Sequence, residues 1–144
     1  MIENLPGSFN NVRQLGQLLD PLPELGLHLD IGHANLLVDH NTTGEILSAY
    51  AARLCHVHLH DNKGGSADLH LPLGAGSIEW EEYIRQLRDV GYDGTITLEV
   101  FTPDRRHLEY SREVLREAWD SLPSNGHPRV SDHAVEVQGA KCEH

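Results

Sequence analysis

LHLDI, at residues 27–31, is the first of three stretches that alternate apolar and polar side chains; HVHLH at 56–60 and TITLEV at 95–100 are the others. Successive side chains of a β-strand point to opposite faces, so each stretch predicts a strand with one apolar and one polar face. Residues 1–4 predict a further, short strand, which places Ile2 and Glu3 on opposite faces. We therefore expect four strands whose apolar faces pack against other elements.

Segments with apolar residues at helical spacing lie between these strands. Helices are predicted over 11–19 and 108–122, a third begins at Thr42 or Thr43, and a fourth begins at Ser77. Strands that alternate with helices favour parallel pairing through βαβ crossovers, which predicts an α/β protein. The repeat of about 30 residues is close to one eighth of a (β/α)8 TIM barrel of ~250 residues. Residues 1–122 therefore predict half of such a barrel, with four parallel βα units.

The composition of the chain argues against nucleic-acid binding and membrane insertion, and its last residues differ from the rest. Residues 123–144 show no periodicity and predict a flexible tail. The 144-residue chain carries a net charge of −11, which opposes binding to nucleic acid. No apolar run approaches the ~20 residues that span a bilayer, and the N-terminus lacks the pattern of a signal peptide. We expect a cytoplasmic protein that does not act at a membrane.

The polar faces of the predicted strands carry acidic residues and histidines. Glu3, Asp30 and Glu99 lie near the carboxyl ends of three strands, and either His58 or His60 lies near the end of another. Barrel enzymes keep their active sites at that end. Two deeper histidines, at 28 and 56, are expected to be hydrogen-bonded groups inside the barrel.

A convergence of carboxylates and an imidazole predicts a divalent cation. Three buried carboxylates without a cation would repel one another and take up protons. Oxygen ligands with one imidazole suit Mn²⁺, Mg²⁺ or Co²⁺, and Zn²⁺ is a further candidate. The alternative for each single residue is an interior polar group satisfied by hydrogen bonds.

Five segments together resemble the xylose isomerase-like TIM barrel superfamily. They are LDIGHAN at 29–35, HLHDN at 58–62, DLHLPLGAGSI at 68–78, GYDG at 91–94 and LEV at 98–100. The resemblance covers about residues 2–120 and corresponds to the C-terminal half of the barrel, strands five to eight. The superfamily contains sugar phosphate isomerases and epimerases and the endonuclease IV nucleases.

The resemblance to the isomerases and epimerases implies a ligand set and a reaction. One metal would be held by Glu3, Asp30, His58 and Glu99, and His33 would contact the substrate. The metal would act as a Lewis acid on an open-chain sugar, while Glu3 and Glu99 remove and return a proton through an enediolate. The implied function is a divalent-metal-dependent sugar or sugar phosphate isomerase or epimerase, incomplete as this chain.

Asp68 and His70 leave a different branch open. In endonuclease IV the matching pair, with the histidine that corresponds to His33, holds an additional zinc. The first alternative function is therefore a zinc-dependent AP endonuclease. A structural role is equally open, in which Asp68 or His70 clamps a loop by binding backbone amides near Gly74 and Gly76. A non-catalytic half-barrel is the third interpretation.

Half a barrel exposes two sheet edges and part of a core. We therefore expect a homo-oligomer, or a missing N-terminal half that completes the barrel. The expected ligand is a small-molecule sugar or sugar phosphate.

Overall fold

Four parallel strands form one sheet in the order β1-β2-β3-β4 in the computed structural model, which describes residues 1–123. The strands are β1 (Ile2–Glu3), β2 (Leu27–Asp30), β3 (Leu54–Leu59) and β4 (Ile96–Leu98). Every predicted strand is present. Strands β1, β2 and β4 are shorter than their alternating stretches, and β3 begins two residues before its stretch and ends one residue before the end of that stretch. The predicted tail lies outside the described residues from 124 onward.

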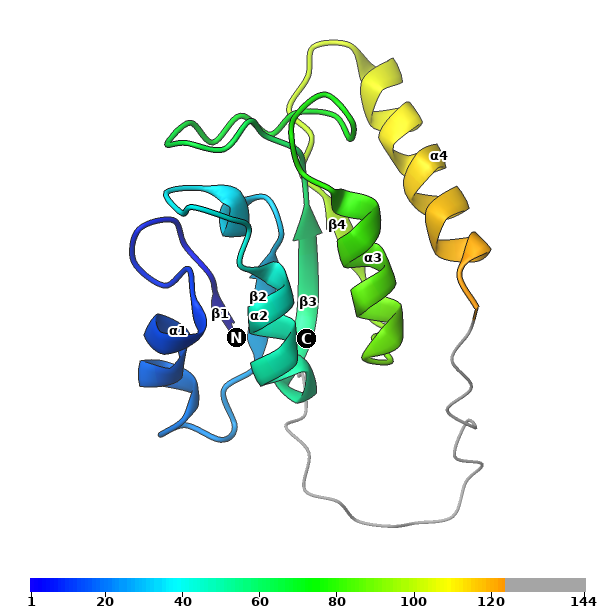
Figure 1. The fold of residues 1–144 in the computed structure, drawn as a ribbon. Coiled ribbons are helices and arrows are strands. Elements are labelled where there is room, and N and C mark those ends of the chain that lie inside the picture. Colours follow the sequence, from blue (N-terminus) through cyan, green and yellow to red (C-terminus); the bar gives the residue numbers. More distant parts are fainter. Residues whose placement is uncertain (124–144) are drawn as a thin grey trace.

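One helix follows each strand, as the α/β prediction requires. The α-helices are α1 (Val12–Leu19), α2 (Thr43–Tyr50), α3 (Trp80–Asp89) and α4 (Arg105–Ser121), and two short 3₁₀ turns cover His33–Asn35 and Ala51–Arg53. In Figure 1, α1, α2 and α3 cover one face of the sheet, and α4 stands beside β4. The loops that follow the strands gather at the end to which the strand arrows point.

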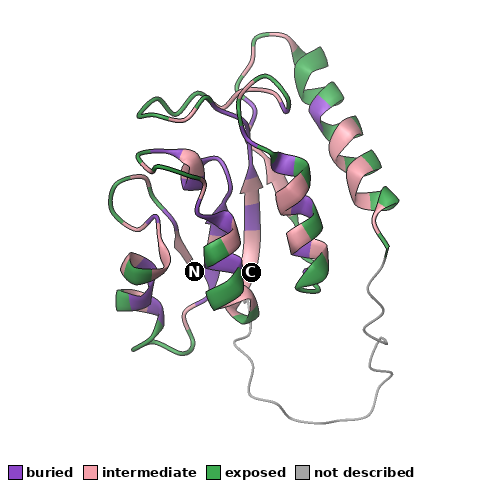
Figure 2. Ribbon diagram, in the orientation of Figure 1, coloured by how far each residue is buried: buried purple, intermediate pink, exposed green. Residues whose placement is uncertain are grey.

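The core lies between the sheet and the first three helices (Figure 2). Apolar side chains of one parity on β2 and β3 are fully buried there: Leu27, Leu29, Val57 and Leu59. They pack with fully buried residues of the helices, which are Leu15, Leu19, Ile46, Ile84 and Leu87. The opposite parity carries the polar residues, so the alternation in the sequence directs them to the concave face that a closed barrel would enclose.

Helix α2 begins at Thr43, as expected, whereas α3 begins later than expected, and in both cases the predicted capping hydroxyl binds elsewhere. Helix α3 begins at Trp80 rather than at Ser77, whose hydroxyl donates to the Asn62 carbonyl at 3.3 Å. Thr42 precedes α2, but its hydroxyl donates to the Asn10 carbonyl at 2.8 Å and caps nothing. Both residues tie neighbouring loops together instead.

The sheet ends at β1 on one side and at β4 on the other, so the described residues form an open half-barrel rather than a closed ring. Beside β4, a groove of about 670 Å³ runs between the sheet and α4. Its apolar lining comes from Ile96, Leu98, Leu108, Leu115 and Trp119. None of the helices among residues 1–123 is long and apolar enough to cross a membrane.

Candidate metal centre

The carboxyl ends of the four strands bring the predicted ligands together. Glu3 ends β1, Asp30 ends β2, His58 lies one residue before the end of β3, and Glu99 directly follows β4. The Nδ1 atom of His58 lies 3.2 Å from Glu99 Oε1, 3.8 Å from Asp30 Oδ2 and 3.8 Å from Glu3 Oε1. Three carboxylates therefore surround one imidazole nitrogen.

Two overlapping ligand sets result. Asp30, His58 and Glu99 each place a ligand atom within 4.8 Å of the other two. Glu3 forms a second set of this kind with Asp30 and His33. Asp30 is common to both sets, so it is the residue around which a single cation would be bound.

Asp30 is held rigidly by its backbone. Its amide donates to Asn4 Oδ1 at 2.7 Å, and Asn4 Nδ2 donates to the Asp30 carbonyl at 2.9 Å. The side-chain Oδ1 accepts from the amide of His33 at 2.9 Å. Asn4 is itself fully buried and is positioned by Asn10. The other carboxylate oxygen of Asp30 therefore points at the centre from a fixed position.

The donor set fits a divalent cation. Asp30 Oδ2 and His58 Nδ1 are buried, and neither has a hydrogen-bond partner among the described residues. A buried polar atom without a partner costs about 1–3 kcal/mol, and a cation between these two atoms would remove that cost. Three carboxylate oxygens and one imidazole are a donor set suited to Mn²⁺, Mg²⁺ or Co²⁺.

The crowding of charge is visible in the pKa values. Burial raises the pKa of Glu3, and Asp30 and Glu99 add to this, although His33 acts against it. Burial also favours a higher pKa for Asp30, but the approach of His60 and His33 lowers it overall. Burial lowers the pKa of His58 in spite of Glu99 and Asp30. These directions favour the ionised form of Asp30 and the neutral form of His58, which are the forms that bind metals.

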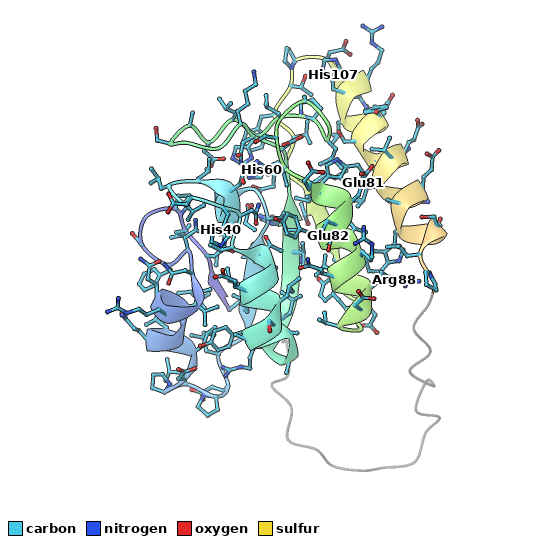
Figure 3. The ribbon with its side chains drawn as sticks, in the orientation of Figure 1. His40, His60, Glu81, Glu82, Arg88 and His107 are labelled. Carbon is cyan, nitrogen blue, oxygen red and sulfur yellow. The ribbon has the colours of Figure 1, made fainter. Side chains whose placement is uncertain are left out.

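A second cluster lies beside the first. His33, His60, Asp68 and His70 each place one ligand atom within 4.8 Å of the others. His60 is fully buried at the end of β3 (Figure 3), with Nε2 3.3 Å from Asp30 Oδ1 and 3.7 Å from Asp68 Oδ1. Burial favours a lower pKa for His60, but Asp30 raises it overall, and Asp68 contributes.

The hydrogen bonds of the second cluster define which nitrogens are free. His70 Nδ1 lies 2.8 Å from the Glu99 carbonyl, and His33 Nδ1 lies 3.1 Å from the Asn4 carbonyl. A carbonyl only accepts, so both Nδ1 atoms are donors. The two Nε2 atoms face the same oxygen, Asp68 Oδ2, at 3.1 and 3.3 Å. In neutral histidines these would be lone pairs facing a carboxylate, so a proton or a cation must lie between them.

Asp61 clamps the loop that carries Asp68 and His70. Its carboxylate accepts from the amides of Gly74 at 3.0 Å, Gly76 at 2.8 Å and Ile78 at 3.1 Å. These are the amides that the loop-clamp alternative assigned to Asp68 or His70. A Cβ at position 76 would collide with the Asp61 carboxylate, which explains the glycine there.

The two deeper histidines, His28 and His56, differ in whether they form the expected hydrogen bond. His56 Nε2 lies 3.0 Å from the Thr97 hydroxyl, as expected of a hydrogen-bonded interior group. His28 Nε2 is buried without a hydrogen-bond partner among the described residues. Burial, with His58 and His56 nearby, lowers the pKa of His28 to about 4.

The comparison with protein families settles which fold this half-barrel comes from. The family model described as xylose isomerase-like TIM barrel matches residues 1–119. The chain belongs to this family. The predicted half of a TIM barrel is thereby confirmed, since this xylose isomerase-like chain covers 45% of a solved D-tagatose 3-epimerase-like protein, with a TM-score of 0.67 and 30% identity over 82% of its own residues.

Two curated relatives and a second solved structure are also similar to this chain. An uncharacterised protein of Methanocaldococcus jannaschii is 39% identical over 93 residues, which are 65% of this chain and 31% of that protein. A ketose 3-epimerase of Arthrobacter globiformis is 33% identical over 95 residues, 65% of this chain and 30% of the relative. The apo 3-keto-D-glucoside 4-epimerase of E. coli, at 18% identity over 80% of this chain and 44% of that one, shares the fold with a TM-score of 0.60.

The relatives whose names state an activity or a likeness are a ketose 3-epimerase, a D-tagatose 3-epimerase-like protein and a 3-keto-D-glucoside 4-epimerase. The chain spans about a third of the length of the curated relatives it matches and less than half of the solved structures.

Sequence reasoning gave no role to three residues that support the xylose isomerase-like site. Asn4 and Asn10 position Asp30 and the turn after it, and Asp61 holds the loop after β3. Asn4 directly follows a predicted ligand, which is the one local signal. Asp61 gave no such signal, because three of the four amides it binds lie 13 to 17 residues further along the chain.

Proposed function

We propose that this chain is the C-terminal half of a divalent-metal-dependent isomerase or epimerase of sugars or sugar phosphates. The observation that supports this most directly is the pair of unpartnered buried atoms, Asp30 Oδ2 and His58 Nδ1, between Glu3 and Glu99. The similarity to a ketose 3-epimerase supports a sugar as the substrate class.

In this proposal Glu3, Asp30, His58 and Glu99 hold the cation. Bound there, it supplies Lewis-acid polarisation of a substrate carbonyl and hydroxyl. Glu3 and Glu99 would remove and return the proton of the intervening C–H through an enediolate. Both carboxylates approach the same His58 nitrogen, so both can reach one substrate carbon.

His33 is proposed to contact the substrate. It follows β2 in a short 3₁₀ turn, and its ring lies beside Glu3 and Asp30, with Nδ1 at 3.4 and 3.6 Å from their carboxylate oxygens. Asn10 binds its carbonyl at 2.8 Å and thereby orients the turn. A hydroxyl next to the reacting carbon is the group that an imidazole in this place would bind.

The experiment that tests the function is solvent deuterium exchange into a ketose such as tagatose, followed by NMR with the Mg²⁺-loaded full-length protein, in which this chain is joined to the half-barrel that completes the site. Glu99→Gln should slow exchange by at least roughly 100-fold, because a positioned acid–base group contributes ~10²–10⁴-fold. Glu113→Gln on the exposed side of α4 is the matched control and should exchange like the unsubstituted chain. Equal rates for Glu99→Gln and the control would refute Glu99 as a base.

A second candidate is favoured by the cluster around Asp68. We infer that His33, His60, Asp68 and His70 bind a second cation, because two donor-oriented histidines face one carboxylate oxygen. Histidine ligands whose other nitrogen donates to a carbonyl are the usual arrangement in zinc sites. A zinc-dependent phosphodiesterase of the endonuclease IV type would use such a site, although the charge of −11 opposes binding to DNA.

Zinc content separates these possibilities. After loading with Zn²⁺ and gel filtration, His70→Ala should retain about one zinc fewer per chain than the unsubstituted protein, measured by elemental analysis. His40→Ala is the control, since His40 is exposed and, within residues 1–123, forms its ion pair with Glu45 and lies in none of the ligand sets. Unchanged zinc content in His70→Ala would assign Asp68 and His70 to a structural role. A chain that retains no metal, even after reloading, would hold the ligand residues without the geometry and would need its other half.

We also propose that a further half-barrel completes the site, either a second copy of this chain or an N-terminal half. Both edges of the sheet are open, and the apolar groove between β4 and α4 lies beside one of them. Sedimentation of the chain alone at micromolar concentration should show a dimer if a second copy is the partner. A monomer that unfolds cooperatively would contradict the need for any partner.

A further inference from the structure

Three histidines form a separate cluster deeper in the concave face than the carboxylate centre. His28 of β2 and His56 of β3 are paired in register, and His58 lies two residues further along β3 on the same face. The ring centroids of His28 lie 4.9 Å from His56 and 4.0 Å from His58, and those of His56 and His58 are 5.1 Å apart. One ligand nitrogen of each lies within 4.8 Å of the other two.

The proposed function leaves two of these residues unexplained. Neither His28 nor His56 is among the four proposed ligands of the carboxylate centre. His28 Nε2 is buried without a hydrogen-bond partner among the described residues. The nearest acid, Glu3, places Oε2 4.0 Å from the other nitrogen, His28 Nδ1. Leaving such a nitrogen unsatisfied is costly, so a group that binds it would stabilise the fold.

We propose that His28, His56 and His58 form a nitrogen-donor site for a borderline transition metal, with Zn²⁺ as its simplest occupant. Imidazole favours zinc, copper and nickel, whereas carboxylates favour magnesium and manganese. Three histidines with an open fourth position are an established zinc geometry. At Zn–N distances of about 2.1 Å, tetrahedral ligand nitrogens lie about 3.4 Å apart, so side-chain rotations that bring the rings slightly closer complete the site.

The site shares His58 with the carboxylate centre, and this has a functional consequence. A zinc ion held by His28, His56 and His58 would use the imidazole whose Nδ1 faces Glu99 and Asp30 in the carboxylate centre. A neutral imidazole has one unprotonated nitrogen, so the two sites compete for His58, and occupation by zinc would weaken the binding of a hard cation at the carboxylates. The inference rests on the histidine cluster itself and does not require the proposed function.

The test is NMR of the metal-free chain labelled with ¹⁵N-histidine, with ring signals assigned from His28→Gln and His56→Gln. Addition of Zn²⁺ should produce, on one ring nitrogen each of His28 and His56, the large shift change that accompanies direct ligation. In His56→Gln, the zinc affinity reported by His28 should fall at least roughly tenfold. Zinc shifts confined to His33, His58, His60 and His70 would overturn the proposal.

Mg²⁺ is the matched control, because it prefers oxygen ligands. It should perturb His58 without ligating His28 or His56. Failure of Mg²⁺ to affect His58 would contradict the carboxylate centre of the proposed function, and it would leave a zinc response at His28 and His56 unaffected. The two hypotheses can thus fail separately in one experiment.

Discussion

Replacing Asp30 with asparagine should weaken Mn²⁺ binding by more than roughly 100-fold, since the loss of groups that merely orient metal ligands already costs ~10–100-fold. Asp30 is fully buried, and its unpartnered Oδ2 lies 3.8 Å from His58 Nδ1 and 3.6 Å from His33 Nδ1. Asparagine has nearly the same shape but supplies no charge. The residue also belongs to both ligand sets, so its loss removes one ligand atom from each.

Isothermal titration of the chelator-treated chain with MnCl₂ measures this effect. Asp39→Asn is the matched control, because Asp39 is exposed and belongs to none of the ligand sets found among the described residues. Its Mn²⁺ affinity should equal that of the unsubstituted chain. If Asp30→Asn bound Mn²⁺ within about threefold of the control, the carboxylate centre would not be the cation site.

Replacing Asp61 with alanine should lower the free energy of unfolding by about 3 kcal/mol or more, because a buried backbone N–H left unpaired costs about 1–3 kcal/mol. Asp61 is 1% exposed and accepts from four amides, including those of the buried residues Asn62 and Ile78. Removing it frees the loop that carries Asp68 and His70. The second cation cluster should be lost together with the stability.

Urea unfolding followed by circular dichroism gives the free energy, and Asp39→Ala serves as the surface control. Zinc retention measured on the folded variant at low temperature reports the loop separately. A change in unfolding free energy below about 1 kcal/mol would show that water replaces the carboxylate at these amides.

The alternation of side chains explains why so much of the fold was predictable. In β2 and β3 every second residue is apolar, and a strand places those residues on one face whatever surrounds it. The same alternation directs the residues of opposite parity to the concave face, and these include Glu3, Asp30, His58 and Glu99. Strand order follows from alternation with helices, since short right-handed crossovers place consecutive strands side by side.

Helix boundaries were predicted less well, for a physical reason. Ser77 and Thr42 are good capping residues in isolation, but each hydroxyl binds a carbonyl from a loop distant in the sequence. Such long-range hydrogen bonds use the hydroxyl that would otherwise cap the helix. They cannot be predicted from the residues next to the helix start.

Local pattern could not decide which histidine of HVHLH, at residues 56–60, is the metal ligand. His56, His58 and His60 share one parity, yet His56 binds Thr97, His58 faces three carboxylates, and His60 is fully buried beside Asp30 and Asp68. Depth along the barrel axis and the stagger between strands separate these environments. Residues far apart in the chain create them.

By itself, the sequence determined the half-barrel, the face that carries the chemistry and the residue types at the strand ends, because periodicity of two and of 3.6 are local properties. Only the tertiary structure decided which atoms lack partners, that Asp61 rather than Asp68 or His70 holds the loop, and that His28 and His56 converge on His58. Each of these depends on the register between strands and on loops that return over them, which are set by the packing of the whole chain.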